Sequence, residues 1–288
     1  MKVKALAYLG LNATNLDAWE EFSIEVLGLD PVRTADRLQL RLDERAYRFD
    51  VRASDHDGAA WYGWEVATLA DLTECRSALE DFGITVERGT VEEVADRQVI
   101  DLIRFIDPQG MQHEICYGAS FGSSPVSFRR PGTSFVTGQL GLGHLALGVT
   151  DMESTVDFFC DVLGFRPTDV MPGMFAFLRC NTRHHSAAIM QWEKATMHHV
   201  LLQAADLEQV GKTLDAADKR GLVTKTLGRH AIDDLVSFYV ATPSGWDMEV
   251  GFGGIRIDED EWVVRQVGRP FSSWGHQAVV APGAVPAN

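Results

Sequence analysis

The sequence has few cysteines, too little positive charge to favour a polyanionic partner, and no long apolar run. Its four cysteines show no CxxC spacing and lie within apolar segments: Cys75, Cys116, Cys160 and Cys180. This pattern predicts buried free thiols in a reducing compartment rather than disulfides. Lysine and arginine total 26 against 41 aspartates and glutamates. That balance argues against nucleic acid or an anionic membrane as a partner.

The N-terminus lacks the apolar segment of a signal peptide, and no apolar run reaches the roughly 18 residues that cross a membrane. We therefore expect a cytoplasmic protein. The chain has 288 residues, 45% of them apolar. This is enough material for two domains of about 100–150 residues each.

One phrase occurs twice in the chain. The stretch 7–29 matches 141–165, with "VLG" at 26–28 lying on "VLG" at 162–164, an offset of 162 − 26 = 136 residues. Each copy predicts a strand followed by a helix. Asn15 and Asp151 suit helix N-caps, and Gly28 and Gly164 suit the residue after a helix, where positive φ is common.

A second phrase is also repeated. "ADL" at 70–72 aligns with "ADL" at 205–207, and Glu114 aligns with Glu249, both at an offset of 249 − 114 = 135. Each half therefore predicts a strand, a helix and three strands, given twice. The expected fold class is α+β, with four βαβββ modules paired into two domains. The expected boundaries are an N-terminal domain without metal at 1–120, a linker at 121–140, a metal-binding catalytic domain at 141–275 and a flexible tail at 276–288.

The two halves differ at positions that can bind a metal. The second half has His144 where the first has Tyr8, and the "ADL" alignment places His199 on Trp64. Glu249 is matched by Glu114. The C-terminal half thus has two histidines and a carboxylate on three different strands, whereas the N-terminal half keeps only the carboxylate.

Two neutral imidazoles and one carboxylate form the facial set that binds Fe(II) and leaves positions for substrate and dioxygen. Strand alternation places His144 on the same face as Ala146, and Glu249 on the same face as Gly251, so small residues surround these ligands. A closed structural zinc site usually takes thiolates, and no cysteine lies at a matching position. The sequence predicts a metal held by His144, His199 and Glu249.

The phrases around these residues, "GHLALGVTDMESTVDFF", "MHHVLLQAADLEQVG" and "SFYVATPSGWDMEVGFGG", resemble the vicinal oxygen chelate (glyoxalase-like) superfamily. Within it, the chain resembles the two-domain type I extradiol catechol dioxygenases, and above all the 2,3-dihydroxybiphenyl 1,2-dioxygenase group. The resemblance covers nearly the whole chain. It implies an oxidoreductase of aromatic catabolism that inserts both atoms of O2 into a catechol, such as the bicyclic 2,3-dihydroxybiphenyl. It also implies Fe(II) as cofactor, with Mn(II) able to take its place, and a homo-oligomer.

The same resemblance implies further roles. "NTRHHSAAI" matches the segment that supplies the acid–base histidine, here assigned to His185, with His184 as the alternative and as a substrate-binding residue. "GRHAIDDLVSFY" matches the segment that supplies two more catalytic groups, His230 and Tyr239, and Asp233 as a substrate-binding residue.

The chain departs from the family pattern where Ile232 replaces an asparagine and Asp234 replaces a basic residue. These changes bear on which catechol is bound. Two other functions remain open: another metalloenzyme of the superfamily, such as an isomerase or a transferase, and a non-catalytic protein of the same fold that sequesters a ligand.

Overall fold

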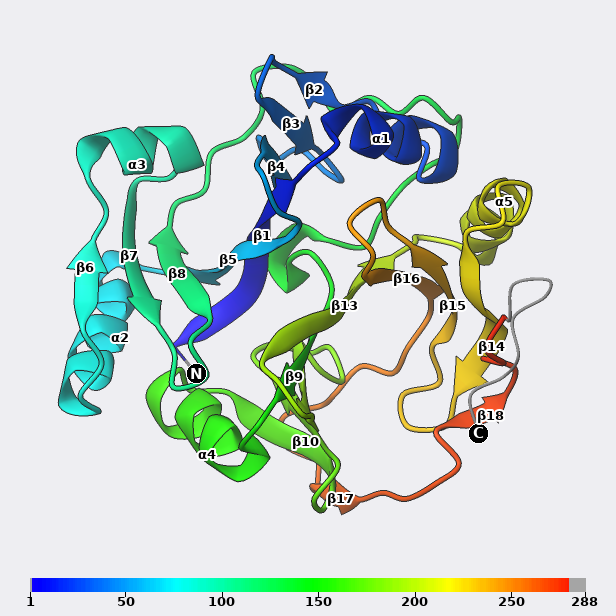
Figure 1. Cartoon of the computed structure of the whole chain (residues 1–288). Coiled ribbons are helices and arrows are strands. Elements are labelled where there is room, and N and C mark those ends of the chain that lie inside the picture. The colour runs from blue at the N-terminus through cyan, green and yellow to red at the C-terminus, as the bar shows by residue number, and fades with distance from the viewer. Residues whose placement is uncertain (1, 280–288) are drawn as a thin grey trace.

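The computed structural model describes residues 2–279, which form two β-sheets flanked by helices (Figure 1). The first sheet contains β1 (Val3–Ala13), β2 (Val32–Arg33), β3 (Arg37–Leu40), β4 (Phe49–Ala53), β5 (Gly58–Val66), β6 (Val86–Arg88), β7 (Asp101–Ile106) and β8 (Gln112–Tyr117). Its strand order is β2-β3-β4-β1-β5-β8-β7-β6. Its helices are α1 (Leu16–Glu21), α2 (Leu69–Asp81) and α3 (Val91–Arg97).

The second sheet has ten strands in the order β17-β10-β11-β12-β9-β13-β16-β15-β14-β18. The strands are β9 (Leu145–Val149), β10 (Arg166–Met171), β11 (Phe175–Arg179), β12 (Ala187–Gln191), β13 (Thr196–Gln203), β14 (Val223–His230), β15 (Val236–Ala241), β16 (Asp247–Phe252), β17 (Arg265–Gln266) and β18 (Ser272–Trp274). Its helices are α4 (Met152–Asp157) and α5 (Leu207–Asp218).

The four predicted βαβββ modules are confirmed. In each module the first strand pairs in parallel with the last: β1 with β4, β5 with β8, β9 with β12 and β13 with β16. The first strands of neighbouring modules then pair antiparallel, β1 with β5 and β9 with β13. The elements outside this plan include α3, inserted between β6 and β7, a 3-10 turn at Gly138–Leu140 between the two halves, and the two edge strands β17 and β18.

The predicted helix ends are also confirmed. Asn15 accepts a hydrogen bond from the backbone N–H of Ala18 at 2.9 Å, and Asp151 caps α4 by accepting from the N–H of Ser154 at 3.1 Å. Gly28 and Gly164 have φ values of 76° and 79°, a region that glycine adopts without steric cost. Each of these helices ends in a π-helical turn, over Phe22–Val26 and Phe158–Val162, a shared detail that the repeat did not predict.

The "ADL" alignment of the second units is wrong by three residues. Thr68 caps α2 and Asp206 caps α5, which gives an offset of 206 − 68 = 138 rather than 135. Inside the sheets, Gly63 pairs with Glu114, and Leu201 pairs with Glu249. The two equivalent partners Gly63 and Leu201 are again 201 − 63 = 138 residues apart. The residue equivalent to His199 is therefore Trp61 and not Trp64. The error arises because the chain from the helix cap to the strand glutamate is three residues longer in the first half, 114 − 68 = 46 against 249 − 206 = 43 residues.

A single hydrophobic cluster extends through both sheets. Trp19 of the first half packs against Trp246 of the second, with ring centroids 5.7 Å apart. Trp64 packs against Phe165 at 5.2 Å. The backbone N–H of Leu142 also donates to the carbonyl of Leu6 at 2.8 Å. The two halves are thus joined through one core.

The segment predicted as a linker also contacts both halves, through bridges from Phe128 to Leu29 and from Phe135 to Ala204. All four cysteines are free thiols, and only Cys160 among them is partly exposed. Within residues 2–279, no helix combines the length and the apolar character needed to cross a membrane. Most of the predicted tail, 280–288, lies outside the described residues.

Candidate active site

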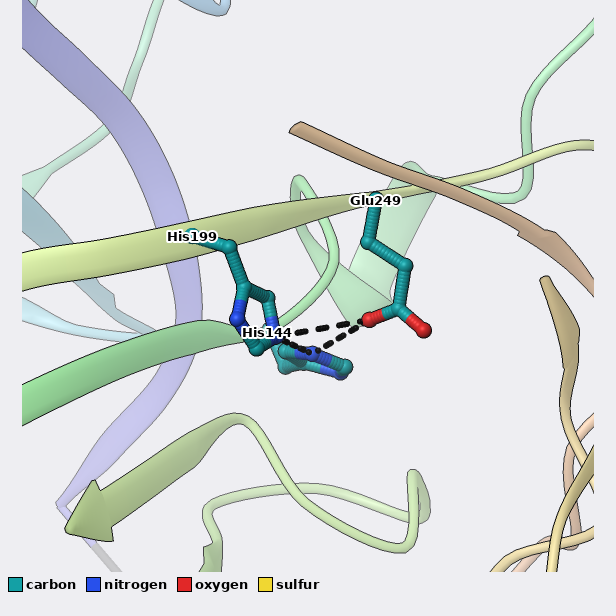
Figure 2. A group of neighbouring side chains, drawn as sticks. All are labelled: His144, His199 and Glu249. Carbon is teal, nitrogen blue, oxygen red and sulfur yellow. Dashed lines mark hydrogen bonds and ion pairs between the residues drawn. The ribbon is translucent and has the colours of Figure 1, made fainter. Parts of the chain in front are cut away.

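The three predicted metal ligands lie on neighbouring strands of the second sheet. His144 directly precedes β9, His199 lies in β13 and Glu249 in β16, and β13 pairs with both of the other strands. Their side chains converge on one point (Figure 2). The Nε2 atoms of His144 and His199 are 3.1 Å apart, and they lie 3.1 and 3.4 Å from Oε2 of Glu249.

This convergence fits a bound cation. Glu249 is fully buried, and its Oε2 atom has no hydrogen bond. Burial opposes ionisation of this carboxyl, but the contacts with His144, His199 and His230 outweigh burial and hold its pKa well below the ordinary value. Burial lowers the pKa of His199 to about 3. The unprotonated imidazole of His199, the imidazole of His144 and the ionised oxygen of Glu249 therefore face one another, and two imidazoles with one carboxylate are the donor set of a divalent metal site.

The other oxygen of Glu249 is held by the protein. Oε1 accepts a hydrogen bond from the hydroxyl of Ser237 at 2.6 Å and lies 3.0 Å from Nε2 of His230. Burial opposes protonation of His230, but its hydrogen bond to Glu249 outweighs burial and raises its pKa. Such outer partners fix the orientation of a ligand and tune the metal.

His230 also lies 3.2 Å from the hydroxyl of Tyr239. Tyr239 is the cross-strand neighbour of Glu249, so these side chains share one face of the sheet. Burial, together with the charge of Glu249, raises the pKa of Tyr239 well above its ordinary value. The phenol is therefore a hydrogen-bond donor at neutral pH.

His276 lines the same site but lies in the segment predicted as a flexible tail, and it was not among the predicted site residues. Its ring lies 4.2 Å from the ring of His230, and its Nε2 is 3.1 Å from the hydroxyl of Ser237. Trp274 in β18 pairs with Arg229 in β14, and this pairing brings His276 back over the site. No repeat or motif in the sequence marks this residue.

The neighbouring residues His184 and His185 point to different places. His185 stacks on His144 with ring centroids 4.1 Å apart, and its Nδ1 is 3.9 Å from Oδ2 of Asp233. His184 instead turns away, and its Nε2 lies 2.9 Å from Oδ2 of Asp169. His184, His185 and Asp233 have potential ligand atoms close together, but the contact with Asp169 engages one nitrogen of His184.

A cavity of about 300 Å³ opens beside His144, His199 and Glu249, which together we call the metal-ligand cluster. Its polar lining includes His144, His185, His199, His230, Tyr239 and Glu249. Its apolar lining includes Phe175, Phe177, Ala188, Met190, Ile232 and Phe271. His184 is absent from this lining. Its volume and aromatic walls suit a small flat ligand whose polar edge meets the histidines.

The two departures from the family pattern lie in different environments. Ile232 lines the cavity and packs near Phe177 and Met190, so it makes that wall apolar. Asp234 does not line the cavity. Its carboxylate pairs with Arg229 at 3.1 Å, and its side chain is 53% exposed.

The equivalent place in the first half is filled by an arginine. The guanidinium of Arg97, from the end of α3, donates to Glu114 through Nε at 3.0 Å and Nη2 at 2.8 Å. It lies 3.7 Å from the ring centroid of Trp61. The hydroxyl of Tyr8 donates to the same carboxylate at 2.8 Å. A protein cation therefore neutralises Glu114 where Tyr8 and Trp61 replace the two histidines.

The fold and the ligand cluster together define a two-sheet metalloprotein of the vicinal oxygen chelate fold. Residues 141–250 match the family model described as glyoxalase/bleomycin resistance protein/dioxygenase superfamily. Residues 6–53 match that described as dihydroxybiphenyl dioxygenase BphC D1.

Whole-chain relatives agree with these matches. The chain is 38% identical to biphenyl-2,3-diol 1,2-dioxygenase of Paraburkholderia xenovorans (strain LB400), covering 97% of each chain. It is 36% identical to the iron-dependent extradiol dioxygenase of Rhodococcus jostii (strain RHA1), covering 96% of this chain and 97% of that one. The solved structure of BphC, a halotolerant catechol dioxygenase, superposes with a TM-score of 0.91 at 32% identity, covering 97% of this chain and 96% of the other. The chain belongs to the extradiol dioxygenase family of this superfamily.

Proposed function

We propose that the protein cleaves the ring of a catechol next to its two hydroxyls and inserts both atoms of O2. The observation that carries the proposal is the buried Oε2 of Glu249, which has no hydrogen-bond donor within residues 2–279 and faces two imidazole nitrogens at the edge of an aromatic cavity. His144, His199 and Glu249 would hold Fe(II), or Mn(II) in its place. When bound, the metal would supply Lewis acidity toward the catechol oxygens and a site for dioxygen.

The remaining polar residues of the cavity would act on the catechol itself. His185 lines the cavity, and its imidazole would take up and return a proton. Tyr239 would donate a hydrogen bond to one catechol oxygen. His230, held between Tyr239 and Glu249, would orient the hydroxyl next to it. Asp233 lies beside His185 at the same wall and would help to position the substrate.

The apolar walls support a substituted or bicyclic catechol, such as 2,3-dihydroxybiphenyl, as the substrate. Phe175, Phe177 and Phe271 would contact the second ring, while the hydroxyl-bearing ring faces the ligand cluster. Ile232 adds no hydrogen-bonding group to this wall, so a hydrocarbon substituent fits better than a polar one. We further propose that the protein is a cytoplasmic homo-oligomer. Its four free thiols are consistent with a reducing compartment.

The test is to load the purified protein anaerobically with Fe(II), add 2,3-dihydroxybiphenyl and then admit air. Consumption of one O2 per catechol, with growth of the visible absorbance of a ring-opened product, is expected. E249A should abolish turnover, whereas H56A, which changes an exposed histidine of the other half, should leave it unchanged. Binding of the catechol without oxygen uptake would contradict the proposal and favour ligand sequestration.

A further inference from the structure

A buried series of polar side-chain contacts connects the surface of the molecule to His185. The guanidinium of Arg265 donates to Asp169 through Nε at 2.8 Å and Nη2 at 2.5 Å. The next link, from Asp169 to Nε2 of His184, is 2.9 Å long. Nδ1 of His184 then lies 3.0 Å from Nδ1 of His185. Asp169 is fully buried and the two histidines are nearly so, whereas the Arg265 side chain is 45% exposed.

The C-terminal segment supplies the outermost residue of this series of contacts, Arg265. After β16 the backbone returns to the far edge of the second sheet, where β17 pairs in parallel with β10 (Figure 1). In this pairing Arg265 is the register partner of Asp169. A two-residue strand thus places a cation on a buried carboxylate. Burial opposes ionisation of Asp169, but hydrogen bonds from His184 and Arg265 outweigh it and lower its pKa.

The chemistry of these groups fixes where the protons lie. An ionised carboxylate only accepts hydrogen bonds, so Nε2 of His184 must carry the proton that faces Asp169. We take His184 to be a neutral imidazole, in which the other nitrogen is then an acceptor. Nδ1 of His184 therefore accepts, and Nδ1 of His185 must donate to it. This leaves Nε2 of His185 without a proton, and within residues 2–279 that atom has no hydrogen-bond partner.

We infer that Asp169, acting through His184, is a positioning residue that holds His185 in the tautomer with a free Nε2 lone pair for the catechol. This inference rests on the proposed ring cleavage, in which His185 takes a proton from the substrate. Arg265 supports Asp169 from outside. The arrangement follows the general pattern in which a carboxylate orients a catalytic imidazole and fixes its tautomer, with a second histidine interposed.

The first test measures the tautomers directly. Nitrogen-15 NMR of the full-length, histidine-labelled protein, metal-free and again after addition of Zn(II), distinguishes protonated from unprotonated ring nitrogens. Wild type should show His184 protonated at Nε2 only and His185 protonated at Nδ1 only. D169A should shift His185 toward the Nε2-protonated form. A wild-type spectrum with His185 protonated at Nε2, or with both nitrogens of His184 protonated, would overturn the inference.

The second test measures turnover of the Fe(II)-loaded protein. D169A should lower kcat by about 10–100-fold, the usual effect of losing an outer partner of a site residue, while KM and bound iron change less than about two-fold. D169N is the second variant in case D169A does not fold, and it should show a smaller loss because its amide oxygen still accepts from His184. Unchanged kcat in both variants refutes the inference.

The matched control is E259Q. Glu259 pairs with Arg179 and Arg166, from the hairpin that contains Asp169, at 3.0 and 2.7 Å. Among residues 2–279 it forms no ion pair or hydrogen bond with a histidine. Its kcat should equal that of wild type, and an equal loss there would show that any disturbed ion pair in this hairpin lowers turnover, against the inference. The NMR result does not depend on turnover. If the wild-type protein cleaves no catechol, the proposed function fails while the tautomer result stands separately.

Discussion

The ion pair in the metal-free half gives a stability prediction of defined size. Arg97 and Glu114 are 9% and 2% exposed at their side chains. The R97M substitution removes the guanidinium but leaves Glu114 buried, and of its donors among residues 2–279 the hydroxyl of Tyr8 alone remains. Breaking a buried pair in this way costs about 3–5 kcal/mol, because the remaining charge is uncompensated. Asp96, the other partner of Arg97, keeps its ion pairs with Arg37 and Arg52, so it adds little to this cost.

The double variant R97M/E114Q is the matched comparison. It replaces both charges by neutral groups of similar volume, and Tyr8 can still donate to the amide oxygen. Replacement of a whole buried pair is often close to neutral. We therefore expect the free energy of unfolding of the double variant to lie within about 1–2 kcal/mol of wild type.

The assay is urea unfolding followed by tryptophan fluorescence and far-UV circular dichroism, with agreement of the two probes as the check on two-state behaviour. Thermal unfolding should place R97M about 10 °C below wild type, at roughly 2–4 °C for each kcal/mol. Folded R97M should keep its oxygen uptake, because the change lies outside the metal-ligand cluster. The reasoning is refuted if R97M unfolds within about 1 kcal/mol of wild type, or if the double variant is as unstable as the single one.

Three further outcomes can be checked. E249A should lower retention of Fe(II) by at least about 100-fold in metal analysis, whereas S237A, which removes only an outer contact of the same carboxylate, should lower it by about ten-fold; equal retention by all three proteins would contradict the ligand assignment. Gly143 has φ 153°, and an added Cβ would lie 1.9 Å from the carbonyl oxygen of Leu201, so G143A should displace the adjacent ligand strand and lose both bound metal and stability, a result that unchanged iron content would exclude. Because the pKa of Asp169 is lowered in the folded protein, its ionised carboxylate stabilises the fold above about pH 4, the ordinary aspartate value. This contribution disappears as the pH falls through the folded-state pKa. The urea midpoint of wild type should therefore fall more steeply below about pH 4 than that of D169N, and parallel curves would argue against this contribution.

The repeated sequence predicted the modules well because strand-helix units are set by local signals. The caps Asn15 and Asp151 and the glycines Gly28 and Gly164 depend on neighbours within a few residues, and all four are where the pattern placed them. Register between distant strands depends on loop lengths instead. Three extra residues between the cap of α2 and Glu114 were therefore enough to make the short "ADL" match align Trp64 rather than Trp61 with His199.

The site shows the same division. His144, His199 and Glu249 lie at equivalent places in repeated units, so comparison of the two halves could find them. Asp169 and His276 belong to no repeated phrase and meet the site only through sheet pairing and through the return of the C-terminal segment. Arg97 is similar, because it comes from α3, which has no counterpart in the other half.

The packing of Trp19 on Trp246 and of Trp64 on Phe165 bears on how such a duplicated chain can evolve. Each half covers apolar surface that the other half would otherwise expose to water. Deletion of the first half would therefore expose apolar surface of the half that contains the metal-ligand cluster. Loss of chemistry from one copy is then tolerated, whereas loss of its bulk is not. Selection on the first half would then act on shape and volume, and the positions of Tyr8 and Trp61 could accept any residues that fill the space and balance the charge of Glu114.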